Sequence, residues 1–180
     1  MRLIRSEAKD RPRELNQMSK IKWRSRDEPV TKDEVENDGE KLGVKFPIDY
    51  IEVAKDYNGA HVSPKLFQVE GKEKVFGTLL TYDNEDDEHI LEVFNDYMDT
   101  LPKKIIPIVF DPSGNLICFD YKEHEDNPIV VFWEHENAWE KEMLMQEEGL
   151  TEEQAEERAR ENVFYVASTF TEFLNKLYEE

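Results

Sequence analysis

The sequence lacks most of the signals that mark an enzyme. It has one cysteine, Cys118, so no internal disulfide can form, and its seven glycines are scattered rather than grouped in a phosphate-binding loop. It contains no G-x-S-x-G, H-E-x-x-H or C-x-x-C motif. We therefore expect no catalytic residues, no metal site and no cofactor, and we interpret the chain as a non-enzymatic protein.

Two further absences concern location in the cell. The longest apolar runs are far shorter than a membrane span, so we expect no membrane insertion. The sequence shows no secretory signal pattern, and a single thiol is typical of reducing compartments, so we expect a cytoplasmic protein. Cys118 stands within an apolar run, which favours a buried, inert thiol over a reactive one.

Positive charge is scarce outside the N-terminal segment. The net charge is −19, but residues 1–26 hold nine basic and three acidic side chains, so this segment carries +6 and the remainder −25. A body of −25 repels nucleic-acid phosphates and attracts basic proteins. We expect no nucleic-acid partner and a protein partner with a basic face. The alternative is that the charge serves solubility alone.

Apolar runs at residues 105–110, 116–119 and 129–133 define the expected core. They do not alternate with polar residues, which is typical of strands covered on both faces. Asp111-Pro112-Ser113-Gly114 fits a type I turn between the first two runs. We predict a three-stranded meander in the middle of a mostly antiparallel sheet, with helices packed on both faces, in an α+β fold.

Helices are predicted around this sheet. Capping-box spacings begin at Thr31, Thr151 and Thr169, and further helices are expected at about 47–58 and 90–101. Short strands are expected at 66–69 and 75–80. We divide the chain into a basic arm, residues 1–22, and one domain, residues 23–180. An acidic helical insertion, near residues 137–162 and broken at Gly149, lies within that domain.

The order of four segments resembles the SUKH superfamily. They read LGVKFPIDYIEVAKDYNGA, IIPIVFDPSGNLICFDY, IVVFWEHE and VASTFTEFLNKL. This superfamily includes fungal cell-wall synthesis regulators and many bacterial immunity proteins. The resemblance implies an α+β fold and a non-enzymatic role in protein binding. It points first to an immunity protein that neutralises a cognate toxin, often a nuclease. A regulatory or scaffold protein of the cell-wall branch is the alternative.

Three groups of side chains are candidates for partner binding. The first is an acidic run that either contacts a partner or complements the next helix, and the second is an acidic rim at one sheet end. The third is Trp139, an aromatic anchor among charges. The residues are Asp83, Glu85, Asp86, Asp87 and Glu88; Asp111, Glu134 and Glu136; and Trp139. An enzyme using Asp120, Glu134 or Glu136 is a weaker hypothesis, because nothing marks one carboxyl as an acid and another as a base.

The four histidines were considered as metal ligands. If Tyr121 pairs with Ile129 in the meander, His135 lies opposite Asn115, and His124 lies in the connection at the other end. The two histidines are then roughly 20 Å apart and cannot share an ion. We therefore expect structural or solvent-exposed histidines and no metal.

Overall fold

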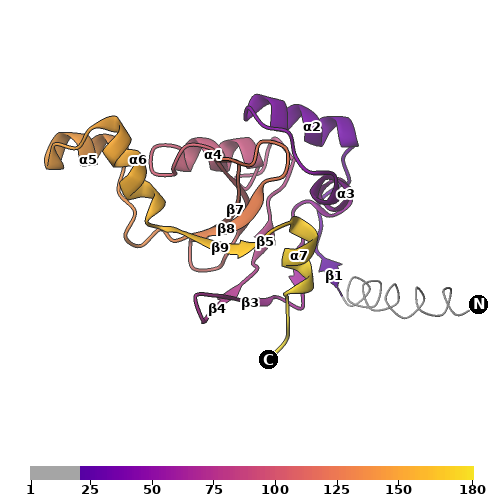
Figure 1. Ribbon diagram of the computed structural model, residues 1–180. Coiled ribbons are helices and arrows are strands. Elements are labelled where there is room, and N and C mark those ends of the chain that lie inside the picture. The colour runs from indigo at the N-terminus through magenta and orange to yellow at the C-terminus, as the bar shows by residue number, and fades with distance from the viewer. Residues whose placement is uncertain (1–20) are drawn as a thin grey trace, which may run out of the picture.

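The computed structural model describes residues 21–180, so the predicted basic arm lies almost wholly outside the described residues (Figure 1). Its centre is an antiparallel sheet of order β5-β6-β7-β8-β9. Its strands are β5 Thr78–Leu79, β6 Ile105–Phe110, β7 Leu116–Asp120, β8 Ile129–Trp133 and β9 Val163–Ala167. Two small antiparallel pairs join β1 Lys22–Arg24 to β2 His61–Ser63 and β3 Leu66–Val69 to β4 Lys72–Val75.

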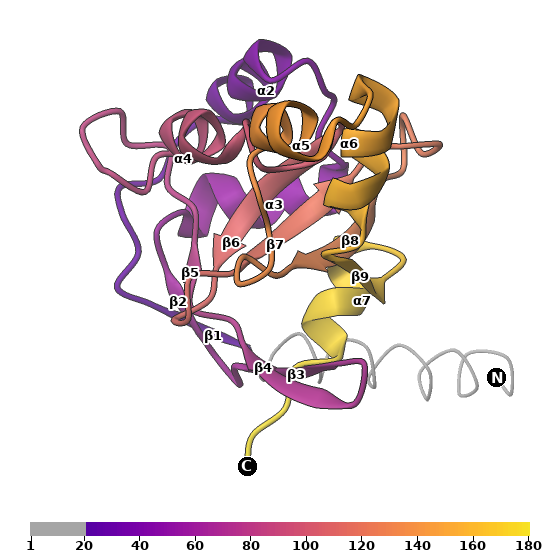
Figure 2. The same cartoon turned by 90° about the vertical axis from the view of Figure 1, so that its left-hand side faces the viewer.

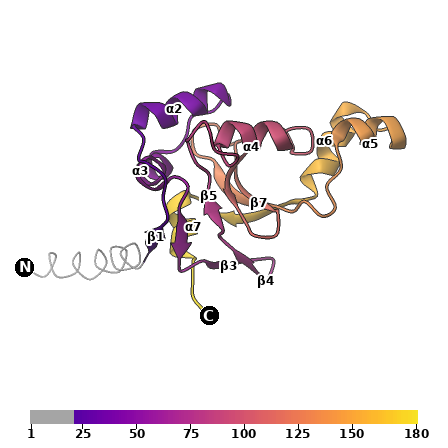
Figure 3. The same ribbon diagram turned by 180° about the vertical axis from the view of Figure 1, so that it is seen from behind.

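The helices surround this sheet. They are α2 Lys32–Lys41, α3 Ile48–Tyr57, α4 Ile90–Tyr97, α5 Lys141–Glu148, α6 Glu152–Arg160 and α7 Phe170–Asn175. Figure 2 shows α4, α5 and α6 on one side of the strands, and α7 with the β3–β4 hairpin on the other. Figure 3 shows α5 and α6 at the end of the molecule opposite α3 and β1. The predicted α+β class is confirmed.

The predicted meander is confirmed, and its strands are covered on both faces. On one face Trp133 packs against Tyr97 of α4, with ring centroids 5.7 Å apart. On the other face Phe119 packs against Tyr50 of α3 at 5.2 Å and against Phe170 of α7 at 6.3 Å. Because both faces are apolar, these strands show no polar alternation.

Cys118 is fully buried in β7, as predicted. Burial raises the pKa of its thiol well above the ordinary value, and the neighbouring Asp120 carboxylate raises it further. A thiol that stays protonated is a poor nucleophile, so this cysteine serves packing.

The helix ends follow the sequence signals in two of three places. Thr31 and Thr151 form complete capping boxes. Gly149, at φ +69°, ends α5. The third box is incomplete: Thr169 accepts from the Glu172 amide, but the Glu172 carboxylate accepts from the Ser168 amide instead of the Thr169 amide. Glu172 therefore stabilises the residue before the cap.

One predicted strand, at 75–80, is broken. β4 ends at Val75, and the chain crosses at Gly77 into the central sheet as β5. The Gly77 amide donates to the Phe110 carbonyl at 2.9 Å, and a Cβ on Gly77 would lie 2.5 Å from that oxygen. The crossing therefore requires glycine. The edge strand β9 and the β1–β2 pair were not predicted.

The predicted register of β7 and β8 is wrong by one residue. Asp120, not Tyr121, lies opposite Ile129. A slip of one residue exchanges the two faces of a strand, but here both faces are apolar, so the sequence pattern does not select the register. Specific polar contacts at the strand ends do so, and they are described below.

Candidate partner-binding surface

The acidic run, residues 83–88, forms the loop that leads into α4. Asp83, Glu85 and Asp87 are exposed, whereas Asp86 and Glu88 are half-buried. The Asp83 carboxylate accepts from the Glu85 amide at 3.0 Å, and the Asp86 carboxylate accepts from the Glu88 amide at 2.8 Å. Two of the carboxylates therefore stabilise turns within the loop. The N-cap of α4 is His89, which makes no side-chain capping bond.

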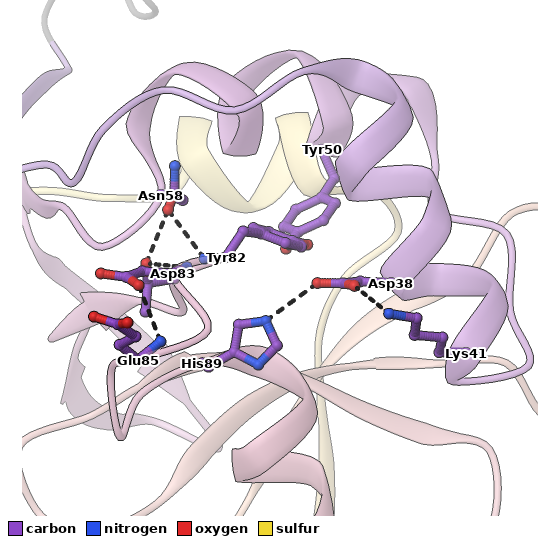
Figure 4. A network of polar contacts seen from close by, with 9 residues as sticks. Asp38, Lys41, Tyr50, Asn58, Tyr82, Asp83, Glu85 and His89 are labelled. Carbon is purple, nitrogen blue, oxygen red and sulfur yellow. Dashed lines mark hydrogen bonds and ion pairs between the residues drawn. The ribbon is translucent and has the colours of Figure 1, made fainter.

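A buried amide fixes the base of this loop (Figure 4). The Asn58 side-chain oxygen accepts from the Thr81 hydroxyl at 2.9 Å and from the Tyr82 amide at 3.0 Å. The Thr81 hydroxyl in turn accepts from the Asp83 amide at 3.1 Å. Asn58 adopts φ −55° and ψ 144°, outside the left-handed region, and its side chain is fully buried.

The other side of the loop rests on α2 and α3. The Tyr50 and Tyr82 hydroxyls lie 2.6 Å apart, and burial raises the pKa of both phenols. His89 Nε2 lies 3.3 Å from the Asp38 carboxylate of α2, but it is not aligned as a hydrogen bond. Both of these side chains are buried. The network in Figure 4 therefore holds the acidic loop in place.

The acidic rim is only partly a charged surface. Asp111 is 6% exposed, and its carboxylate accepts from the Ser113 amide at 2.8 Å, the Asn115 amide at 2.8 Å and the Asn115 side chain at 3.0 Å. Because this carboxylate forms the turn, little of it is exposed to a partner, and its role in partner binding stays a prediction. Glu136 is exposed and Glu134 is half-buried.

Glu134 and Glu136 do not share a strand face, because β8 ends at Trp133. Both still line one surface hollow with the Asp111 turn. His135 contacts Asn115, although not as the predicted cross-strand pair: its amide donates to the Asn115 side-chain oxygen at 3.0 Å, and its ring Nδ1 lies 2.7 Å from the same oxygen.

The structure brings the acidic loop close to the rim. Glu88 lines a second hollow with Phe110 and Asp111, on the other side of the same turn. Burial raises the pKa of Glu88, and the nearby Asp86 raises it further. Arg24, His61 and Lys65 also line this hollow, so its charge is mixed. The exposed part of the acidic surface therefore consists of the loop and Glu136.

Trp139 lies in the segment between β8 and α5, and it is 58% exposed. The Lys141 amide donates to the Asp99 carbonyl at 3.0 Å, which joins this segment to the end of α4. Met98, at the same end of α4, is 47% exposed. Met98 was not among the predicted residues, because no local sequence pattern distinguishes it from its apolar neighbours.

Two partly buried ion pairs help to fasten the α5–α6 hairpin, residues 141–160. Arg160 makes two bonds to Asp120 of β7, at 2.8 and 3.1 Å, and Lys141 bonds Glu156 at 2.7 Å. Burial raises the pKa of Glu156, but hydrogen bonds from Lys141 and from the Lys103 amide lower it more, so the net pKa is below the ordinary value. Asp120 is thus a structural carboxylate.

Neither a metal centre nor a membrane span stands out in the part of the chain that the structure describes. Among residues 21–180, no three His, Cys, Asp or Glu side chains lie where they could jointly hold a metal ion. Within the same residues, every helix is too short or too polar to cross a bilayer.

Comparisons with known proteins cover most of the described chain. The model of the SMI1 / KNR4 family (SUKH-1) matches residues 29–176. The SPbeta prophage-derived uncharacterized protein YokK of Bacillus subtilis (strain 168) is 28% identical over 157 residues, which are 77% of this chain and 70% of that protein. The family match includes the acidic loop, the rim and Trp139.

Proposed function

Because the chain belongs to the SMI1 / KNR4 family (SUKH-1), whose domains often bind partner proteins, we propose that it is a non-enzymatic immunity protein. It would bind and neutralise a cognate toxin domain that presents a basic face. The observation that carries this proposal is the concentration of exposed carboxylates on a body of net charge −25.

The acidic loop is suited to steering such a partner. Five of its six residues are acidic. Within residues 21–180, none of these carboxylates takes part in an ion pair, so their field reaches solvent. Carboxylates of this kind accelerate encounter with a basic surface and reject like-charged partners.

A nuclease is the toxin class that best fits this charge. A nuclease binds phosphates with a basic face, and an acidic inhibitor on that face competes with nucleic acid. The buried network beneath the loop holds its carboxylates in one arrangement, which reduces the entropy lost on binding.

The first experiment is co-expression with toxin domains encoded beside the gene. We expect growth to be restored and a stable complex to form, with an association rate that falls steeply as salt is raised. A rate that does not change with salt would remove the electrostatic part of the proposal. Failure to neutralise any neighbouring toxin, together with a stable complex with a housekeeping protein, would favour the regulatory alternative of the cell-wall branch.

An enzymatic role is tested separately with amide variants of the rim. Glu134→Gln and Glu136→Gln remove the two candidate carboxyls that do not take part in turns or ion pairs of the described chain. We expect partner affinity to change and neutralisation to persist at saturating concentration. A turnover that these variants abolish would overturn the non-enzymatic assignment.

A further inference from the structure

We propose that the corner between α4 and α5 is a docking site for a basic amphipathic helix of the partner, with Trp139 and Met98 as apolar anchors. We call the surface formed by Met98, Asp99, Trp139, Glu140 and Glu142 the α4–α5 corner. The identity of the partner rests on the proposed function, whereas the chemistry of the docking site rests on this surface alone.

One backbone hydrogen bond joins the two chain segments that carry the anchors. The Lys141 amide donates to the Asp99 carbonyl at 3.0 Å. Met98 adjoins Asp99, and Trp139 stands two residues before Lys141, so both anchors flank one hydrogen bond. Met145, on the α5 helix that starts here, is also exposed. A single exposed apolar side chain is common on a protein surface, but exposed tryptophan and methionine side chains on joined segments are typical of interfaces.

Charge identifies the occupant. The chain segments that form the corner, residues 96–100 and 139–142, hold four acidic side chains and one basic side chain, Lys141, so these nine residues carry −3. The ammonium of Lys141 is already bound by Glu156 at 2.7 Å. Asp99, Glu140 and Glu142 form no ion pair among residues 21–180.

A basic amphipathic helix fits this combination better than other ligands. Its apolar stripe covers Trp139 and Met98, while its lysines and arginines meet the surrounding carboxylates and the face of the indole ring. An apolar or acidic partner would desolvate those carboxylates without pairing them, which is unfavourable. Nucleic acid and anionic lipid are repelled by the same charge.

The corner is also held rigidly. Leu144 is buried beneath α5, and the ion pairs Arg160–Asp120 and Lys141–Glu156 fasten the hairpin to the sheet and to itself. A docking surface that is formed before binding loses less conformational entropy when the partner arrives.

The test uses the full chain and three synthetic helical peptides of equal length. The first has an apolar stripe and a lysine-rich face, the second replaces the lysines with glutamine, and the third has the composition of the first in scrambled order. We expect only the first to bind well by isothermal titration. Trp139→Ala should weaken its binding at least about tenfold. The matched control is Ile48→Ala, because Ile48 is 69% exposed and lies on α3, at the other end of the molecule (Figures 1 and 3).

Two results would overturn the docking site: equal binding of the scrambled peptide, or an unchanged affinity in Trp139→Ala. Glu140→Lys with Glu142→Lys provides a second variant, expected to abolish the preference for the lysine-rich peptide.

Neutralisation assays separate this proposal from the previous one. If the Trp139→Ala protein neutralises a toxin as well as the unaltered chain, the corner is refuted and the immunity role stands. If peptide binding depends on Trp139 but no toxin is neutralised, the corner stands and the immunity role fails.

Discussion

Arg160 offers the sharpest test of how the α5–α6 hairpin is fixed to the sheet. Its guanidinium binds both oxygens of Asp120, at 2.8 and 3.1 Å, and donates to the Lys103 carbonyl at 3.0 Å. The Asp120 side chain is only 9% exposed and that of Arg160 22%. Arg160→Met would leave Asp120 buried with a single remaining bond, from the Lys122 amide at 3.0 Å.

We expect Arg160→Met to cause a large loss of folding stability for a residue that is partly exposed. Breaking a buried ion pair costs about 3–5 kcal/mol of folding stability. Because Arg160 is partly exposed, we expect a cost at the lower end of this range, about 3 kcal/mol. For a chain of this size that corresponds to a fall of roughly 6–12 °C in Tm. Asp120→Asn should cost less, about 1–2 kcal/mol of stability, because the Arg160 guanidinium still contacts solvent and still donates to the Lys103 carbonyl.

The assay is urea denaturation of the single variants and of the double variant Arg160→Met/Asp120→Asn. We expect a coupling energy of about 2 kcal/mol between the two positions. Arg158→Met is the matched control, since Arg158 lies on the same helix and pairs with Glu148 at 2.9 Å with both side chains about half exposed. It should cost less than about 1 kcal/mol. If Arg160→Met costs no more than Arg158→Met, the hairpin is not held by this pair.

Three further predictions concern polar groups. The pKa of Glu156 is lowered in the folded state, so its stabilising effect is complete above the ordinary carboxylate pKa and is lost as pH falls through the lowered pKa. Glu156→Gln should therefore make the Tm depend less on pH in the acid range, as thermal melts at several pH values would show. Tyr50→Phe should cost about 1–3 kcal/mol in urea denaturation, since it leaves the buried Tyr82 hydroxyl without its hydrogen-bond partner. The double variant with Tyr82→Phe should cost less than the sum of the two single variants. Asn58→Ala should lower the urea midpoint by an amount equivalent to about 3 kcal/mol, because the groups it pairs stay buried; a cost below about 1 kcal/mol would mean that water replaces the amide.

Local signals were read correctly from the sequence, because a few neighbouring residues determine them. Thr31 and Thr151 open helices through bonds to residues three positions away, and the turn at Gly114 depends on its positive φ. The meander was predictable for a related reason: long apolar runs are expensive to expose, so they mark the buried strands.

Long-range features were not predictable in this way. The strand β9 pairs with β8 across the whole helical hairpin, and nothing near it in the chain indicates that pairing. Asn58 has the sequence context of a turn residue, and only the packing of residues 81 and 82 against it gives its amide a buried role. Met98 is exposed at the C-cap of α4, whereas Leu101, three residues later, is buried, and no local pattern separates the two.

The sequence predicted the candidate surface only in part. Trp139 and three of the five carboxylates of the acidic loop are exposed, but Asp111 is turned inward. An Asp before a Pro-Ser-Gly sequence readily accepts from amides two and four residues ahead, as the Ser113 and Asn115 amides show. Whether a carboxylate forms such a turn or faces a partner depends on its rotamer, which composition does not encode.

The uniform apolarity of the central strands has a consequence for how this sequence is free to change. A shift of β7 along its neighbours would replace one apolar side chain with another, so hydrophobic burial alone is compatible with several alignments. The choice between them falls to a few hydrophilic residues at the strand termini: Asn115 with Asp111 and His135 at one end, and Asp120 with Arg160 at the other. Related sequences should therefore interchange leucine, isoleucine, valine and phenylalanine along these strands, while they keep the polar residues at the strand ends.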